Sequence, residues 1–249
     1  MSEILIFGGT TEGRQLAEFC AAKGIYAAVS TATEYGAELL PQSDFIRELV
    51  GKLDGQEIFA LLENGDYPVV IDATHPFARN VSQNVRTACA KSGKRYLRLL
   101  REESGAPCGN VFNGISEIVE YLNTNSRKAL ITTGGNSLAE YTKVCDFRTR
   151  LTVRILPAEG AAERCTELGF APENVIPEKG PFTVSQNIRD IKRAGAEILV
   201  TKESGNAGGF PEKAEAARQC GAELVVLRRP VEQGYSLAQI ECQLETEIR

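Results

Sequence analysis

Short runs of β-branched residues alternate with helical patterns along the chain, and this alternation restricts the possible folds more than any other feature. In the first half, the runs predicted as strands are residues 3–7, 26–31, 45–50, 68–72 and 95–100. Helices are predicted over residues 11–23, 54–62 and 77–91, with Asp54 as the N-cap of the second. Buried strands that alternate with helices are typical of a mainly parallel sheet covered on both faces.

A segment rich in turn residues at 105–110 interrupts this pattern, which then starts again. The later predicted strands are residues 129–133, 150–156, 197–202 and 224–227, and the helices lie near 161–168, 184–193 and 211–220. We therefore predict an α/β fold of two Rossmann-like halves, with mainly parallel sheets and a cleft between the halves. Residues 1–110 are the expected dinucleotide-binding domain, and 111–249 are expected to contribute to the substrate site.

Composition excludes several classes of partner. Among 249 residues, 43% are hydrophobic, yet no apolar run approaches the roughly 20 residues of a membrane helix, and the N-terminus has no basic region typical of a signal peptide. Seven cysteines include no Cys-x-x-Cys pair, which indicates reduced thiols and no metal site. A net charge of −5 disfavours nucleic-acid binding. We expect a cytoplasmic monomer or weak homodimer.

Ligands of doubly wound α/β folds bind at the carboxyl ends of the strands. Four segments occupy such positions here, namely residues 8–14, 72–78, 132–136 and 202–209.

The first of these segments is a glycine-rich loop between a strand and a helix. Its candidate cofactor contacts are Gly8, Gly9, Thr10, Thr11, Gly13 and Arg14. Glycines allow a pyrophosphate to approach the backbone, and a helix N-terminus offers unpaired N–H groups. The loop lacks the strict Gly-x-Gly-x-x-Gly spacing, and it lacks the Lys-Ser/Thr ending of an ATPase loop. The alternative is a turn that only joins the strand to the helix.

The end of the second strand is where the ribose of a dinucleotide would lie. Ser30, Thr31 and Thr33 are candidate contacts to a ribose hydroxyl or a 2′-phosphate, and Glu34 would repel a phosphate. This chemistry favours NADH weakly over NADPH, and both cofactors remain open.

The segment 72–78 contains His75, the single histidine of the chain. His75 is a candidate to orient a nicotinamide, bind a carboxylate or supply a proton, and the alternative is a structural histidine. The neighbouring Thr74 is a further candidate cofactor contact.

Six segments in order resemble the precorrin-6A reductase family of cobalamin biosynthesis. They are residues 8–14 (Gly-Gly-Thr-Thr-Glu-Gly-Arg), 72–78 (Asp-Ala-Thr-His-Pro-Phe-Ala), 132–134 (Thr-Thr-Gly), 180–182 (Gly-Pro-Phe), 201–205 (Thr-Lys-Glu-Ser-Gly) and 226–230 (Val-Leu-Arg-Arg-Pro). The resemblance implies reduction of a macrocycle double bond by hydride from NADPH or NADH, with the tetrapyrrole between two Rossmann-like domains. Residues 31–36 resemble the cobalt-precorrin branch, so metal-free and cobalt-containing substrates both remain open.

A macrocycle fringed with carboxylates calls for scattered cations around its site. Candidate substrate contacts are Arg98, Arg101, Lys179, Lys202 and Lys213, together with Ser204 and Gly205 of a predicted mobile loop over residues 204–209. Lys202 and His75 are the candidate catalytic residues. The alternative for each cation is a solvated surface charge.

Two other functions are alternatives. Short-chain dehydrogenases use a Tyr-x-x-x-Lys pair, and Tyr141-Thr142-Lys143 has the wrong spacing for it. A non-catalytic nucleotide-sensing protein would use the same glycine loop without the segment 202–209.

Overall fold

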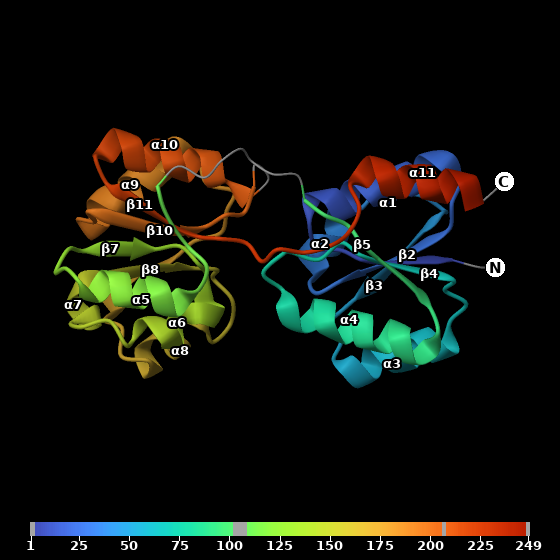
Figure 1. Cartoon of the computed structure of the whole chain (residues 1–249), viewed down its shortest axis with the longest axis horizontal. Coiled ribbons are helices and arrows are strands. Elements are labelled where there is room, and N and C mark those ends of the chain that lie inside the picture. Colours follow the sequence, from blue (N-terminus) through green and yellow to red (C-terminus); the bar gives the residue numbers. More distant parts are fainter. Residues whose placement is uncertain (1–2, 102–108, 206–207, 248–249) are drawn as a thin grey trace. The chain divides into compact units, whose positions relative to one another are not determined.

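The chain divides into two compact units, and each unit contains one parallel sheet (Figure 1). Unit 1 comprises Met1–Glu102 and Val231–Arg249, and unit 2 comprises Glu103–Pro230. The computed structural model describes residues 3–101, 109–205 and 208–247, so most of the predicted turn segment 105–110 lies outside the described residues.

Unit 1 contains a five-stranded sheet of order β3-β2-β1-β4-β5, in which every pairing is parallel. Its strands are β1 (Ile4–Phe7), β2 (Ala27–Thr31), β3 (Ile46–Val50), β4 (Val69–Asp72) and β5 (Arg95–Arg98). Its helices are α1 (Thr11–Lys23), α2 (Glu34–Glu38), α3 (Gly55–Asn64), α4 (Arg79–Ser92) and α11 (Leu237–Glu247).

Alternate residues of β1 enter two separate hydrophobic clusters, as the two-residue period of a strand requires. Ile4 and Ile6 pack in one cluster with α1 and α11, and Leu5 and Phe7 pack in the other with α3 and α4. Helices therefore cover both faces of the sheet, which explains why β1 is apolar throughout.

Local capping determines where the helices of unit 1 begin and end. Thr10 caps α1, which ends before Gly24 in the left-handed conformation (φ 69°), so the predicted bounds 11–23 are confirmed. Asp54 and Glu57 form a reciprocal capping box at the start of α3, which confirms the prediction that Asp54 is the N-cap.

Unit 2 contains a six-stranded parallel sheet of order β6-β11-β10-β7-β8-β9. Its strands are β6 (Asn110–Phe112), β7 (Ala129–Ile131), β8 (Leu151–Ile155), β9 (Val175–Pro177), β10 (Ile198–Lys202) and β11 (Glu223–Leu227). Its helices are α5 (Ile115–Asn123), α6 (Leu138–Tyr141), α7 (Phe147–Arg150), α8 (Ala161–Glu167), α9 (Val184–Ala194) and α10 (Phe210–Cys220), with 3₁₀ turns η1 (Gly135–Ser137) and η2 (Pro172–Asn174). Helices α9 and α10 pack together over one face of this sheet.

The predicted domain assignment is wrong at the C-terminal end. Residues 231–249 belong to unit 1, and the division falls after Glu102, not after residue 110. The physical reason is apolar burial: Ile240 and Leu244 of α11 are buried in the cluster that contains Leu16 of α1. Tyr235 also donates its N–H to the carbonyl of Arg98 at 2.8 Å, beside the end of β5. The expected cleft between the halves stays a prediction.

Of the helices in the described part of the chain, none has the length and apolar character needed to cross a membrane.

Candidate active site

Each sheet has one point at which the strand order reverses, and ligands of this fold class bind there. In unit 1 the point lies between β1 and β4, because the chain runs outward from β1 through β2 and β3 and then returns to β4. In unit 2 it lies between β7 and β10 for the same reason. The predicted segments 8–14 and 72–78 flank the first point, and 132–136 and 202–209 flank the second.

Thr10 ties the glycine loop to the end of β4. Its hydroxyl accepts the N–H of Gly13 at 3.1 Å and donates to the carbonyl of Ala73 at 2.7 Å. The hydroxyl proton of Thr10 is therefore already used within unit 1. The predicted contact of Thr10 with a cofactor would therefore not use this proton.

The two ends of the glycine loop differ in the space around them. Gly9 has φ +94°, and a Cβ added there would meet no atom within 4 Å. A Cβ added at Gly13 would lie 3.2 Å from the Cβ of Ala73 and 3.3 Å from the Cα of Gly8. Gly13 thus permits close packing of α1 on the sheet, and Gly9 leaves open space beside the loop backbone.

The first turn of α1 carries the remaining polar groups of the loop. Among the described residues, the N–H groups of Thr11 and Glu12 have no acceptor, as expected at a helix N-terminus. The carboxylate of Glu12 accepts from Arg101 at 2.8 Å, so this predicted substrate contact instead neutralises a carboxylate beside the loop. Arg14 pairs with Glu18 one helical turn away, at 3.5 Å.

At the end of β2, two predicted ribose contacts hydrogen-bond to nearby main chain. Thr31 donates its hydroxyl to the carbonyl of Thr33 at 3.2 Å, and the hydroxyl of Thr33 accepts from Gly36 at 3.2 Å as the cap of α2. Ser30 is buried, and its carbonyl accepts from Gly8 at 2.8 Å. Glu34 is exposed in the first turn of α2.

A buried hydrogen-bond network follows β4. The carboxylate of Asp72 accepts from the N–H and the hydroxyl of Thr74, from Arg98 at 2.8 Å, and from Tyr96 at 2.9 Å. Burial, and secondarily the charge of Asp72, raises the pKa of Tyr96. Such a network fixes the backbone that leads into His75.

This network corrects the roles predicted for Arg98 and Thr74. Arg98 is 2% exposed and donates to the carbonyls of Asp72 and Thr74 and to Glu232, all at 3.0 Å, so it holds the loop rather than reaching a substrate. The hydroxyl of Thr74 bonds to Asp72 and lies 3.0 Å from that of Ser82, so it too is satisfied within unit 1.

His75 is half-buried, and one hydrogen bond determines the tautomer of its neutral ring. Its Nδ1 accepts the N–H of Phe77 at 3.2 Å, so the neutral ring carries its proton on Nε2. The two rings lie 5.8 Å apart. Pro76 lies in a turn and α4 begins at Arg79, two residues after the predicted start.

Unit 2 has a second glycine turn, after β7. Gly134 has φ +88°, and a Cβ at Gly134 or Gly135 would meet no atom within 4 Å. The hydroxyl of Thr133 is buried, 2.9 Å from that of Ser137 and 3.2 Å from that of Tyr141. Tyr141 therefore belongs to the interior of unit 2.

The predicted cations of unit 2 differ in burial. Lys202 ends β10 and is half-buried, and burial lowers its pKa. Lys213 is 9% exposed and donates to the carbonyl of Gly208 at 3.3 Å, and burial, with the charges of Arg154 and Lys202, lowers its pKa to about 8. Lys179 is exposed.

The predicted mobile loop is described only in part, because residues 206 and 207 lie outside the described residues. The hydroxyl of Ser204 donates to the carbonyl of Gly208 at 2.9 Å, and Gly205 is in the left-handed conformation (φ 71°).

Arg154 is a functional candidate that sequence reasoning missed. It is 5% exposed within β8, donates to Asp190 at 2.8 Å, and lies 3.7 Å over the ring of Phe182. One sequence feature could have revealed Arg154: it lies between Val153 and Ile155, inside a strand whose other residues suit full burial.

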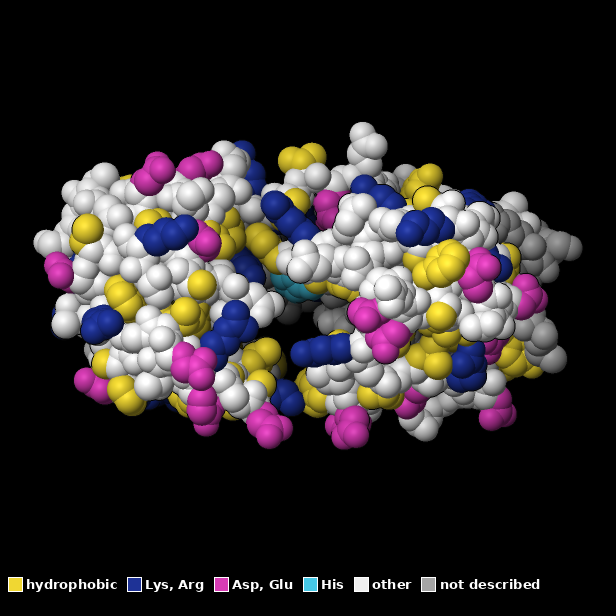
Figure 2. All heavy atoms as spheres, turned by 90° about the horizontal axis from the view of Figure 1, so that it is seen from below, with side chains coloured by type: hydrophobic (Ala, Val, Ile, Leu, Met, Phe, Trp, Pro, Cys, Tyr) yellow, Lys and Arg dark blue, Asp and Glu magenta, His cyan; other side chains and the backbone are white. Residues whose placement is uncertain are grey.

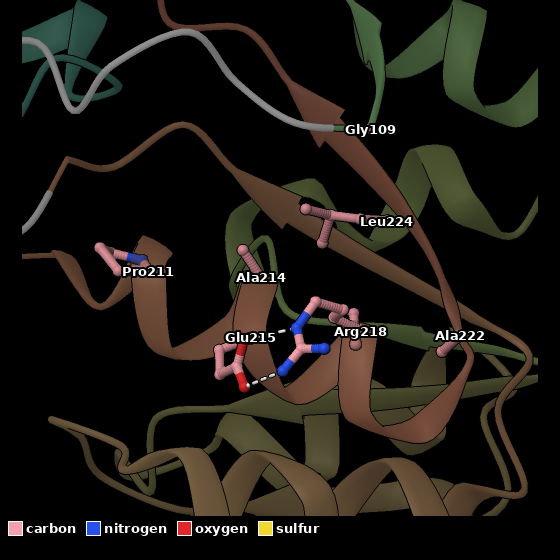
Figure 3. Close-up of a pocket in the computed structure, with 8 residues that line it drawn as sticks. Gly109, Pro211, Ala214, Glu215, Arg218, Ala222 and Leu224 are labelled. Carbon is pink, nitrogen blue, oxygen red and sulfur yellow. Dashed lines mark hydrogen bonds and ion pairs between the residues drawn. The ribbon is translucent and has the colours of Figure 1, made fainter.

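A surface pocket of unit 2 lies apart from these residues. It opens beside α10 and β11, and an ion pair between Glu215 and Arg218 lies at its wall (Figure 3). Its lining consists of Gly109, Pro211, Ala214, Glu215, Ala217, Arg218, Ala222 and Leu224. None of the predicted site residues lines this pocket.

On the face shown in Figure 2, side chains of Lys and Arg and side chains of Asp and Glu are interspersed. Within residues 3–101, 109–205 and 208–247, no group of three or more His, Cys, Asp or Glu side chains is placed to hold a metal ion.

Two parallel sheets and a glycine loop at a strand-order reversal define an α/β protein of the Rossmann-like class. Residues 3–245 match the family model described as Precorrin-6x reductase CbiJ/CobK, and the chain belongs to this family. Membership in this family confirms the resemblance stated from the sequence. It also confirms the predicted α/β fold class and the prediction that the protein is a reductase.

Named relatives and a solved structure agree with this assignment. The chain is 30% identical to the cobalt-precorrin-6A reductase of Methanothermobacter thermautotrophicus, over 91% of this chain and 76% of the relative. It is 30% identical to that of Salmonella typhimurium, over 92% and 88%, and 27% identical to the precorrin-6A reductase of Rhodobacter capsulatus, over 92% and 89%. The solved structure titled CobK precorrin-6A reductase has a TM-score of 0.75 at 24% identity and covers 99% of this chain and 97% of its own, which supports the fold.

Proposed function

We propose that this protein reduces a double bond of a precorrin-6A-type macrocycle in cobalamin biosynthesis, with hydride from a nicotinamide dinucleotide. The observation that carries the proposal is the open glycine loop at the strand-order reversal of unit 1, in a chain of the precorrin-6x reductase family. Unit 1 would hold the dinucleotide, and unit 2 would supply cations to the substrate.

The residues of the loop fit a pyrophosphate. Gly9 leaves open space over the backbone, and the N–H groups of Thr11 and Glu12 lie at the positive end of α1. Arg101 offsets the charge of Glu12, which would otherwise repel a phosphate. When bound, the dinucleotide would supply the hydride, and the protein would align it and exclude water.

We propose NADH as the preferred dinucleotide. The segment from residue 30 to residue 46 contains Glu34, Glu38 and Asp44 and no lysine or arginine. A 2′-phosphate at the end of β2 would therefore face acidic side chains, whereas a free ribose hydroxyl could donate to Glu34.

Reduction of a double bond adds one hydride and one proton. His75 presents an Nε2–H group, and Lys202 presents an ammonium group, so each is a candidate to hold the proton or to stabilise charge that develops on the macrocycle. Lys179, Ser204, Gly205 and Lys213 remain proposed substrate contacts. Any cobalt would belong to the substrate, and two of the relatives described above, both 30% identical, are named cobalt-precorrin-6A reductases.

The proposal includes a cytoplasmic location and a monomer or weak homodimer. Six described cysteines are free, which suits a reducing compartment.

Steady-state turnover of precorrin-6A and cobalt-precorrin-6A with each dinucleotide tests the proposal. We expect turnover with a higher kcat/KM for NADH than for NADPH. Absence of turnover with all four combinations would overturn the proposed function, and a preference for NADPH would overturn only the assignment of the cofactor.

The variant Lys202→Ala distinguishes a role in binding the substrate from a role in binding the cofactor. We expect KM for the macrocycle to rise at least tenfold while the Kd of NADH, measured by fluorescence titration, stays within twofold. Lys192→Ala is the matched control, because Lys192 is exposed on α9. An equal loss of both affinities in Lys202→Ala would mean that Lys202 serves the cofactor or the fold.

A further inference from the structure

A carboxylate distant in sequence completes the network around Asp72. Glu232 lies 134 positions after Arg98, and its Oε2 accepts from Nη2 of Arg98 at 3.0 Å. The side chains of Glu232 and Arg98 are 19% and 2% exposed, so water and salt screen this ion pair less than a pair on the surface. Glu232 therefore makes a partly buried contact within unit 1, to which the proposed reaction assigns no role.

Charge balance alone does not require Glu232. Asp72 is fully buried and already pairs with Nη1 of Arg98 at 2.8 Å, and a second carboxylate adds an excess negative charge and a cost of desolvation. The Nε of Arg98 is buried and has no acceptor among the described residues. Without Glu232, the described residues would therefore hold the guanidinium at Nη1 only. Glu232 thus fixes the orientation of the guanidinium.

The segment that carries Glu232 is bound to β5 without help from its carboxylate. Tyr235 donates its N–H to the carbonyl of Arg98 and accepts from the N–H of Leu100, both at 2.8 Å. A Cβ added at Gly234 would overlap the carbonyl oxygen of Arg98, so the two backbones approach closely there. Removal of the Glu232 side chain should therefore leave this segment in place.

Arg98 acts on the peptide group that precedes His75. Its Nη1 donates to the carbonyl of Thr74 at 3.0 Å, and this carbonyl and the nitrogen of His75 belong to one planar group. The carbonyl of His75 accepts the N–H of Ala78 at 2.7 Å, and its ring accepts the N–H of Phe77. Hydrogen bonds thus hold both peptide groups beside His75, and one of the two depends on Arg98.

We propose that Glu232 is a positioning residue for His75, which acts through Arg98 and the carbonyl of Thr74. The contacts that carry the proposal lie within unit 1, and only its consequence for catalysis rests on the proposed function. Without Glu232, the guanidinium of Arg98 turns about Nη1, and the ring of His75 takes several orientations. The ring then lies less often where the reaction needs its proton.

The ring of His75 reports on this positioning directly, because the chain contains no other histidine. A full chain labelled with ¹⁵N-histidine therefore gives one pair of ring-nitrogen signals by NMR. At about pH 8.5, where histidine rings are ordinarily neutral, we expect a protonated Nε2 and an unprotonated Nδ1 in the wild type. In Glu232→Ala the two signals should move toward each other or broaden, because the ring then exchanges between arrangements.

Two variants separate geometry from charge, and a third is the matched control. Glu232→Gln keeps the length and an acceptor oxygen, so its ring signals should match the wild type, whereas Glu232→Asp is one methylene shorter and should resemble Glu232→Ala. Glu3→Ala is the control, because Glu3 pairs with Arg47 before β1 and its side chain is 22% exposed, against 19% for Glu232. Equal changes in Glu3→Ala and Glu232→Ala would mean a general loosening of unit 1 and would overturn the proposal.

A double-mutant cycle tests whether the position of His75 matters for the reaction. Glu232→Ala should slow the oxidation of NADH by cobalt-precorrin-6A in a single turnover about fivefold, while the Kd of NADH stays within twofold. In a His75→Asn chain, Glu232→Ala should change this rate less than twofold, because the positioned ring is absent. Equal losses in the two chains would mean that Glu232 acts by another route, which overturns the proposal.

Failure of this proposal and failure of the proposed function give different results. If the wild type turns over neither macrocycle, the proposed function is overturned, and changed ring signals in Glu232→Ala still support the positioning of His75. If the wild type turns over and the ring signals of Glu232→Ala match those of the wild type, the positioning is overturned and the proposed function stands.

Discussion

Gly9 and Gly13 lie in one loop and meet different requirements. Gly13 is needed for space, because a Cβ would press on Ala73, whereas Gly9 is needed for its backbone conformation and for the open face above it. A substitution at Gly9 should therefore change the backbone conformation and the open face of the loop without disturbing the packing of α1.

Gly9→Ala should weaken NADH binding at least tenfold, because the methyl group would occupy the space where a phosphate approaches. The positive φ also costs about 1–2 kcal/mol of stability for a residue with a Cβ. Gly93→Ala is the matched control, because Gly93 has φ +67° and equally open surroundings at the C-terminus of α4. Equal NADH affinities of the two variants, measured by calorimetry, would refute a phosphate at this loop.

Lys213 should make the stability of the fold depend on pH. Its pKa is about 8 in the folded chain against an ordinary 10.5, so above pH 8 the unfolded chain binds more protons than the native chain. The free energy of unfolding should then rise with pH by up to about 1.4 kcal/mol per pH unit.

Urea unfolding of wild type and Lys213→Met at pH 7, 8 and 9 measures this contribution. The buried thiols of Cys20 and Cys89, whose pKa values burial raises to about 12 and about 11, act in the opposite direction above pH 9 but are present in both proteins. We expect the variant to be more stable than wild type at pH 7 and the difference to shrink by pH 9. A constant difference would contradict the pKa of Lys213.

At the scale of elements, α11 closes one face of the unit 1 sheet, although it is remote in sequence from every strand it covers. Ile240 and Leu244 are buried with Leu16 and Cys20 of α1. The stability of unit 1 therefore depends on α11.

Ile240→Ala should destabilise unit 1 by about 2–5 kcal/mol, the usual cost of a large-to-small substitution in a core. Cys242→Ala on the exposed side of the same helix should change stability by less than about 0.5 kcal/mol. Hydrogen exchange can show where stability is lost. Exchange should become faster in α1 and β1 and stay unchanged in β10. A loss confined to unit 2 would contradict the position of α11.

The strands and helices were predictable where local signals determine them. Thr10 and Gly24 delimit α1, and the apolar runs of β1 and β10 need no distant partner to be recognised. The strand β6 was missed because it has three residues and none is fully buried. The helix α5 was also missed, although Ile118, Val119 and Leu122 repeat with a helical period.

For the candidate site, the positions of its segments at strand ends were predictable, and the partners of its individual side chains were less predictable. The rule for strand ends identifies residues 8–14 and 202–209 from topology alone. Arg98 was misassigned because its partners Asp72 and Glu232 are distant in sequence and come together only in the fold. Arg154 was overlooked because its partner Asp190 lies on another element, which no local pattern reveals.

For the whole molecule, two separate units with separate strand-order reversals support the proposal that different parts of the chain recognise the two ligands. NADH should slow hydrogen exchange in residues 8–14 and 72–78, and the macrocycle should slow it in residues 202–205 and α10. Mass spectrometry of the full chain with each ligand alone measures both effects. Protection of unit 2 by NADH alone would contradict the division of roles.

The return of residues 231–249 to unit 1 also has a consequence during synthesis on the ribosome. All of unit 2 emerges before α11, so unit 2 can fold while the apolar side of α1 still lacks Ile240 and Leu244. A nascent chain that stops after Pro230 would expose this side to chaperones and to other unfinished chains. Translation must thus pass Leu244 before the helix that follows the glycine loop packs in a finished core.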